Sequence, residues 1–189
     1  MEIIGKTFDC PVDYFASVHG DPSDEYIQKF IETLKPVSAN IEKVARVPRN
    51  EVWKERMYSA LFHKWRVVQL VEAHGTYDWV FIFRADLTNV NVIKLPDELP
   101  LEKTVYVPTP QPGNNHYIGG RTPDHIDGGS METMKVFSEM FTEIEKYINE
   151  IPENGLYQYL CSKNLSMKEF YWGGEVDPRR GGWGSQNYD

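Results

Sequence analysis

The sequence lacks several features that would each have fixed a class of protein. Its 189 residues include two cysteines, Cys10 and Cys161, which are too few for a disulfide framework or a zinc-ligand spacing. No stretch approaches the ~20 consecutive apolar residues of a membrane span. The first residues also lack the apolar core of a secretory signal. We therefore expect free thiols, no membrane span and a reducing, cytoplasmic location.

Positive charge is also scarce. The chain has 20 Lys and Arg against 28 Asp and Glu, which gives a formal net charge of -8. Binding to nucleic acid without sequence preference needs a basic surface, so we expect no nucleic-acid partner. A nucleotide is not excluded, because one metal ion and one or two arginines can neutralise a diphosphate locally.

The composition is that of one soluble globular domain. Apolar residues make up 41% of the chain and charged residues 25%. Aromatic residues, at 13%, predict either a well-filled core or a pocket that stacks flat rings or sugar faces. Residues 173–189, rich in Gly, Arg and Trp, are expected to form a flexible tail or a lid.

Hydrophobic periodicity predicts alternating strands and helices, which is the pattern of an α/β fold. Asp21, followed by Pro22, is the expected N-cap of the first helix. Ser130 is expected to cap a later helix. A loop is expected over residues 108–129, a length that is often functional. Strands are expected at 12–19, 41–47, 79–84, 91–95, 104–107 and 170–172, and helices at 22–35, 52–74, 131–148 and 152–160.

One apolar run, Trp79 to Arg84, is the most distinctive stretch of the chain, and Asp86 lies just beyond it. Such a run predicts a strand buried on both faces, as in a parallel sheet. Open α/β sheets bind ligands at the carboxyl ends of their strands, where Asp86 would lie. Its carboxylate can hold a divalent cation that binds phosphate oxygens, with Arg84 on an oxygen or on a neighbouring acid. The alternative is a structural Arg–Asp pair followed by a turn.

A second motif is Asp124-His-Ile-Asp-Gly-Gly-Ser130. Gly128 and Gly129 would let the backbone approach a ligand, and the following helix N-terminus favours anionic or hydroxyl-rich ligands. Asp124 and Asp127 are candidates for a base, a metal ligand or an acceptor of sugar hydroxyls. The alternative is a plain loop that ends in an N-cap.

Other polar residues in expected loops are weaker candidates. His116, beside Asn114, and His125 lie in the expected loop over 108–129. Arg179 and Arg180 could belong to a lid that closes over phosphate, or to a frayed terminus.

Taken together, these motifs resemble a known family. The order is Phe62-His-Lys-Trp65, Tyr77-Asp-Trp-Val, Arg84-Ala-Asp-Leu87, Asp124-x-x-x-Gly-Gly-Ser130 and Pro152-Glu153. It is similar to the signature of small GT-A-type glycosyltransferases of bacteria, algae and large DNA viruses, over roughly residues 55–160.

The resemblance implies a single GT-A-like catalytic domain over residues 1–189, with a mixed sheet flanked by helices. The implied activity is transfer of a hexosyl or deoxyhexosyl group from a nucleotide-diphosphate sugar to a glycan or glycoprotein hydroxyl, in host cytoplasm for a viral member. It further implies Mn²⁺ or Mg²⁺ on Asp86, and Asp124 or Asp127 as base. Expected donor contacts are Arg84, Asp86, Gly128, Gly129, Ser130, Arg179 and Arg180, and expected acceptor or loop contacts are Asn114, His116, His125 and Glu153.

Two departures from the signature keep alternatives open. Arg84 replaces the first acid of the Asp-x-Asp motif, and residues 1–10 are short for the strand and loop that hold the nucleotide base in the family. Three expectations follow: residues 3–6 form a shortened version of that part, the base is held differently, or the chain is a shortened, weakened or inactive homologue. A non-catalytic module that binds carbohydrate or a partner protein is the main alternative. A nucleotidyltransferase or phosphohydrolase is less favoured, because such enzymes cluster two or more acids at the metal.

Overall fold

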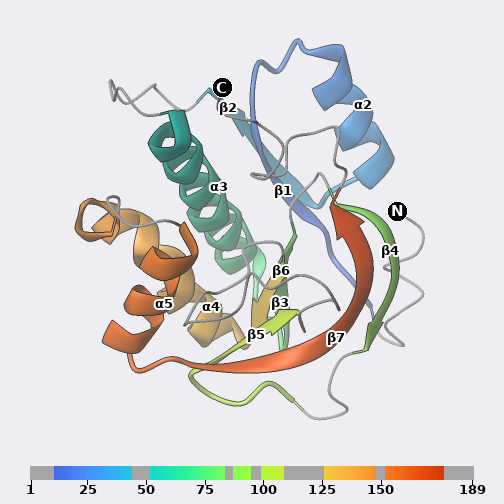
Figure 1. Cartoon of the computed structure of the whole chain (residues 1–189). Coiled ribbons are helices and arrows are strands. Elements are labelled where there is room, and N and C mark those ends of the chain that lie inside the picture. The colour runs from blue at the N-terminus through green and yellow to red at the C-terminus, as the bar shows by residue number, and fades with distance from the viewer. Residues whose placement is uncertain are drawn as a thin grey trace.

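Helices cover one side of a central sheet, and a second small sheet lies beside them (Figure 1). The structure, a computed structural model, describes residues 11–43, 52–83, 87–94, 99–108, 126–147 and 152–176. Both sheets and helices are present, so the chain is mixed α/β as expected.

The small sheet forms one unit with the helix that connects its strands. β1 (Phe15–His19) and β2 (Ser38–Glu42) run parallel, with α2 (Glu25–Leu34) between them in the chain. The strand expected at 12–19 is therefore present with shifted bounds. The strand expected at 41–47 coincides with β2 only at residues 41 and 42, and residues 44–47 lie outside the described part of the chain. We call this segment the β1–α2–β2 unit.

The predicted N-cap of α2 is wrong by three residues. The carboxylate of Asp24 accepts hydrogen bonds from the amides of Tyr26 and Ile27, at 2.9 and 3.4 Å. Asp21 instead accepts from the amide and the hydroxyl of Ser23, which fixes the turn ahead of the helix. Both aspartates precede the helix, and only the backbone geometry decides which one caps it.

The larger sheet has the strand order β3-β6-β5-β7-β4 among the described residues. The β3–β6, β6–β5 and β7–β4 pairs are antiparallel, whereas β5 and β7 are parallel. The bounds are β3 (Val80–Phe83), β4 (Leu87–Lys94), β5 (Thr104–Pro108), β6 (Ile126–Gly129) and β7 (Ser166–Val176). Because β7 extends to Val176, residues 173–176 belong to a strand rather than to the expected tail.

β3 differs from its prediction in two ways. It lies at the edge of the described sheet and pairs only with an antiparallel neighbour, so it is not the central strand of a parallel sheet. It is buried on one face: Val80 and Ile82 are buried, and Phe81 and Phe83 are half-buried. Aromatic residues on the second face gave the sequence its continuous apolar run.

β6 occupies the last four residues of the stretch expected to be a loop. Ser130 follows it and caps α4 (Met131–Ser138) as predicted, because its hydroxyl accepts from the amide of Thr133. The single helix expected over 131–148 is two segments, α4 and the 3-10 helix η2 (Glu139–Lys146). The expected helices at 52–74 and 152–160 correspond to α3 (Val52–His74) and α5 (Pro152–Ser162).

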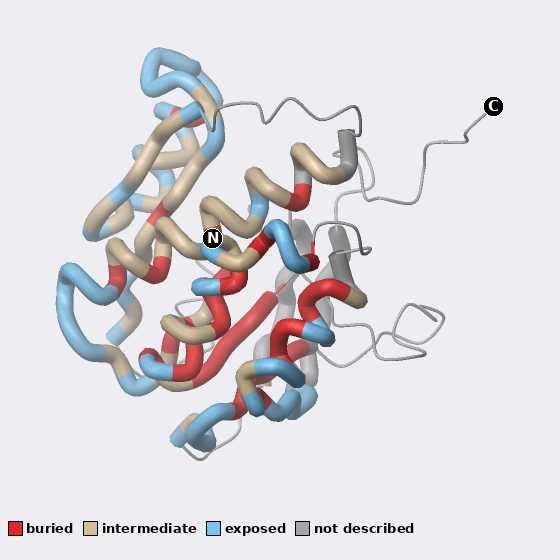
Figure 2. Tube along the Cα trace, turned by 90° about the vertical axis from the view of Figure 1, so that its left-hand side faces the viewer, coloured by how far each residue is buried: buried red, intermediate tan, exposed pale blue. Residues whose placement is uncertain are grey.

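The core lies between the larger sheet and the helices. Side chains of α3, β3, β5, α4 and α5 pack together there, including Val68, Ile82, Val105, Phe137 and Leu160. Figure 2 shows this buried centre, with the β1–α2–β2 unit mostly intermediate or exposed at its side. The larger sheet is therefore the frame on which a site can be positioned.

Candidate functional site

Several strand ends of the larger sheet meet at one edge. β3 and β5 both run antiparallel to β6, so their carboxyl ends lie at the edge where β6 begins. β7 runs parallel to β5 and ends toward the same edge, where β4 begins beside it. In the chain, Arg84-Ala-Asp-Leu87 follows the end of β3, Asp124-His-Ile-Asp-Gly-Gly-Ser130 leads into β6, and residues 177–189 follow β7. We call this edge of the sheet the motif edge.

Two strand pairs mark the motif edge. Phe83, the last residue of β3, pairs with Ile126, the first of β6. Leu87, the first of β4, pairs with Val176, the last of β7. Phe83 and Leu87 are four Cα steps apart in the chain, a span of at most about 15 Å. The strand ends that adjoin Arg84, His125 and residue 177 in the sequence are therefore neighbours.

The motif residues themselves are mostly outside the described part of the chain. Arg84 and Asp86 connect β3 to β4, and Asp124 and His125 directly precede β6 in the sequence. The same applies to Asn114, His116, Arg179 and Arg180, so the roles expected for all eight residues stay predictions. Glu153 lies in the first turn of α5, and its side chain is also outside the described part.

Asp127 is described, and it does not face the motif edge. It lies opposite Ile82 in the β3–β6 ladder, so both side chains point to the helix-covered face. Its side chain has 0% exposure, and its Oδ2 atom lies 2.6 Å from the Nζ atom of Lys64 on α3. Asp127 also takes part in at least one further polar interaction. Its carboxylate is thus part of a buried ion pair between β6 and α3.

Lys64 entered the sequence analysis only as part of the Phe62-His-Lys-Trp65 motif and was given no role, although its spacing held a signal. It lies three residues after Leu61 and four before Val68, on the stripe of α3 that also carries Met57 and Val71. A lysine on an apolar stripe must find a buried partner or reach solvent. Its side chain is 10% exposed, and Nζ lies 5.5 Å from the ring centroid of Phe137.

Gly128 and Gly129 are explained by internal packing. A Cβ atom on Gly128 would lie 2.2 Å from Cε1 of Phe81. A Cβ atom on Gly129 would lie 3.0 Å from the carbonyl oxygen of Thr104 and 3.4 Å from the sulfur of Met134. At these two positions, the space that was expected to admit a ligand is therefore filled by other atoms of the protein.

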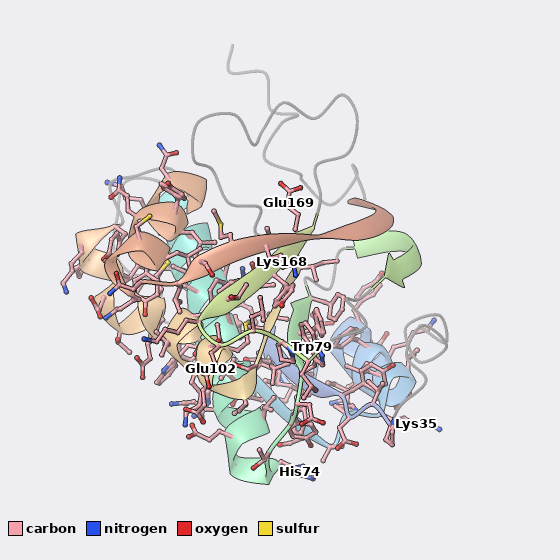
Figure 3. The ribbon with its side chains drawn as sticks, turned by 90° about the horizontal axis from the view of Figure 1, so that it is seen from below. Lys35, His74, Trp79, Glu102, Lys168 and Glu169 are labelled. Carbon is pink, nitrogen blue, oxygen red and sulfur yellow. The ribbon has the colours of Figure 1, made fainter. Side chains whose placement is uncertain are left out.

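An aromatic row covers the second face of the sheet. Trp79 stacks on Phe81 with 5.2 Å between ring centroids, and Phe83 follows at 6.1 Å from Phe81. Tyr106 meets Trp79 edge-on at 4.9 Å, and the Nζ atom of Lys168 lies 5.9 Å from the Tyr106 centroid. Trp79 and Lys168 can be followed in Figure 3. The row runs along β3 toward the motif edge.

A separate polar contact joins β1 to α3. Ser17 Oγ and His63 Nδ1 are hydrogen-bonded at 2.7 Å. Burial, followed by the nearby His19, lowers the pKa of His63 from 6.5 to about 4, with Glu42 acting in the opposite direction. The Nε2 atom of His63 is buried and has no hydrogen-bond partner in the described part of the chain. His63 is therefore neutral at physiological pH.

Neither a metal cluster nor a membrane span is found among the described residues. Within the described ranges, no three His, Cys, Asp or Glu side chains gather in a way that could hold a metal ion. No helix among the same residues has the length and apolar character to cross a membrane. Neither a scan against models of known protein families nor a search of curated proteins finds a match for this chain.

Proposed function

We propose that the chain is a metal-dependent glycosyltransferase with a GT-A-like fold. Its donor is a nucleotide-diphosphate sugar, and its acceptor is a hydroxyl group of a glycan or a protein-linked glycan. One observation carries the proposal: the strand ends that precede Arg84 and follow His125 are paired neighbours, and the strand that precedes the tail ends close by. Binding and catalytic residues often lie on loops that a rigid scaffold of strands and helices positions.

The ligands expected for the metal ion are of the kind that Mg²⁺ prefers. Magnesium in proteins is commonly held by one or two carboxylates together with substrate phosphates. Asp86 and the diphosphate of the donor would form such a set, with Arg84 on a phosphate oxygen. When bound, the cation stabilises the charge that develops on the leaving diphosphate.

Asp124 is the better of the two candidate bases. A base must reach the proton that it removes, and the carboxylate of Asp127 is buried against Lys64. In an inverting reaction, the acceptor oxygen bonds to the anomeric carbon while its proton passes to Asp124. The bond from that carbon to the phosphate oxygen breaks, and its electron pair remains on the nucleoside diphosphate.

Calorimetry on the full chain tests this proposal. Uridine or guanosine diphosphate should bind only with Mn²⁺ or Mg²⁺ present, and Asp86→Asn should weaken that binding by about tenfold or more. Asp78→Asn is the matched control, because Asp78 is exposed at the opposite end of β3. Binding that needs no metal, or that survives Asp86→Asn, contradicts the proposal.

The aromatic row favours a second candidate, a carbohydrate-binding module without catalysis. Sugars commonly pack on aromatic side chains, and Trp79, Phe81 and Phe83 line one face of β3. This alternative predicts binding on a glycan array without metal or nucleotide. It also predicts that Trp79→Ala abolishes the binding while Asp86→Asn leaves it unchanged.

A further inference from the structure

We infer that Lys64 and Asp127 form a positioning pair, which holds the amino end of β6, the strand that Asp124 precedes in the sequence, in place against α3. The inference rests on the proposed function and assigns roles to two residues of the same site. It gives Asp127 a task different from that of the base expected from the sequence.

The ion pair connects α3 to β6 close to the motif edge, only a few residues along the chain from Asp124. Asp127 is the second residue of β6, and Ile126 before it pairs with Phe83 at the end of β3. Asp124 lies three residues before Asp127 in the chain. The 2.6 Å contact to Lys64 therefore fixes β6 next to the point where two motifs leave the sheet.

Stability alone does not account for a charged pair at this position. Around it lie apolar side chains of the core, such as Ile82 and Phe137. Replacing a buried ion pair with apolar residues of similar volume is often neutral or stabilising, because two charges must be desolvated to form it. What an ion pair adds is a directional contact that one arrangement of strand and helix satisfies.

A second ion pair offers a matched control. Lys135 on α4 lies 2.8 Å from Glu72 on α3, so it also joins α3 to a neighbour. The side chains of Lys135 and Glu72 are 33% and 52% exposed, and neither residue belongs to β6. Exposed pairs contribute little to stability and do not constrain a buried strand.

The experiment compares the double variant Lys64→Met/Asp127→Leu with Lys135→Gln/Glu72→Gln and the wild type. Nucleoside diphosphate release from the donor is measured with water as acceptor, using the UDP- and GDP-sugars that the wild type hydrolyses. The Kd of the nucleotide with Mn²⁺ is measured in parallel. We expect the first variant to keep this Kd within about twofold and to lose about 100-fold in kcat, the cost of a misplaced reacting group. The control should match the wild type.

The pH profile separates positioning from catalysis. Since the base is assigned to Asp124, the acidic limb of the kcat profile should persist in the double variant at its reduced rate. If that limb disappears in Asp127→Asn but persists in Lys64→Met, Asp127 is the base and the inference is overturned. Full kcat in the double variant overturns it as well.

Two further outcomes have defined meanings. A wild type that shows no metal-dependent nucleotide binding overturns the proposed function and this inference together, whereas a fully active double variant overturns the inference alone. If the double variant does not fold, Asp127→Glu replaces it, because the longer side chain keeps the charge and shifts β6 from α3. A loss of kcat at constant Kd supports the inference, and an unchanged kcat overturns it.

Discussion

The larger sheet with its helices and the β1–α2–β2 unit are held together by different forces. Val105, Ile126, Met134 and Tyr159 of the larger part have 0% exposure, and many more side chains there are buried. In the β1–α2–β2 unit, the buried apolar residues are Ala16 and Ile27. The first part is thus stabilised mainly by apolar burial.

The β1–α2–β2 unit meets α3 and the residues after it through the packing of Phe15, which meets the His74 ring edge-on at 5.4 Å, and through hydrogen bonds. Ser17 bonds to His63, as described above. Asp13, just before β1, accepts from the hydroxyl of Tyr77 at 2.8 Å, and Tyr77 is also bonded to His74 at 2.7 Å. A hydrogen bond contributes about 1 kcal/mol, whereas a large buried side chain contributes several times more. The unit should therefore open locally before the whole chain unfolds.

The largest effect on stability is expected from a substitution in the core between the larger sheet and its helices. Phe137 is 2% exposed, so Phe137→Ala should lower the free energy of unfolding by about 3–5 kcal/mol through lost burial and a cavity. Urea denaturation followed by circular dichroism measures the change. Glu132→Gln on the same helix is exposed and should stay within about 0.5 kcal/mol of the wild type. A small effect of Phe137→Ala would mean that the apolar core does not dominate stability.

A smaller effect is expected where the second face of the sheet is tightly packed. Gly128→Ala places a methyl group against the Phe81 ring and should cost about 1–3 kcal/mol. Near-ultraviolet circular dichroism of the stacked tryptophan should change as well. Gly75→Ala is the control, because nothing lies within 4 Å of its added Cβ atom. Equal stability of the two variants would contradict the packing role of Gly128.

Acid should affect the β1–α2–β2 unit through His63. Its pKa in the folded state is about 4, below the unfolded value of 6.5, so the unfolded chain binds a proton first as the pH falls. The contribution of neutral His63 to the free energy of unfolding is therefore fully present above pH 6.5 and decreases between pH 6.5 and about 4. The shift corresponds to about 3 kcal/mol at most, and solvent screening of the half-buried ring reduces this to about 1–2 kcal/mol.

Hydrogen exchange of β1 and β2 amides at several pH values, corrected for intrinsic exchange rates, measures this effect. His63→Gln removes the titrating group, so its stability should change less across the same window. Acid sensitivity that is identical in His63→Gln and wild type would assign the effect to other groups, such as Glu42.

The smallest effect on stability is expected from a substitution of Asp24, the N-cap of α2. Asp24→Ala removes the acceptor of two backbone amides and should destabilise the helix by about 1 kcal/mol. Asp24→Asn keeps a capping oxygen and should be nearly neutral. Hydrogen exchange should become faster in α2 but not in α4. Faster exchange throughout the chain would show that the two parts unfold together.

Elements defined by local patterns were predicted well from the sequence. The periodicity of α3 gave both of its ends, and the hydroxyl of Ser130 marked the start of α4. The β-branched and aromatic residues of β5 gave that strand almost to the residue. In each case the deciding interactions lie within a few residues of each other in the chain.

Elements that depend on distant residues were predicted poorly. Asp127-Gly-Gly has the composition of a loop, yet it forms a strand because Gly128 admits the ring of Phe81 and Asp127 pairs with Lys64, 63 residues away. The edge position of β3 likewise depends on which strands pair with it. For the candidate site, the sequence supplied the motifs, but only the sheet topology brings their strand ends to one edge.

The double pairing of β7 limits how its length can vary. Residues 166–170 of this strand pair with β5, whereas 171–176 pair with β4, so its 11 residues span both halves of the sheet. β4 already contains an irregularity, with four steps from Thr88 to Val92 against two in β7. An inserted or deleted residue in β7 would shift Val176 away from Leu87 and carry the tail out of register with the motif edge. Among homologous sequences, we therefore expect insertions and deletions to occur in β4 and to be excluded from β7, whatever side chains β7 carries.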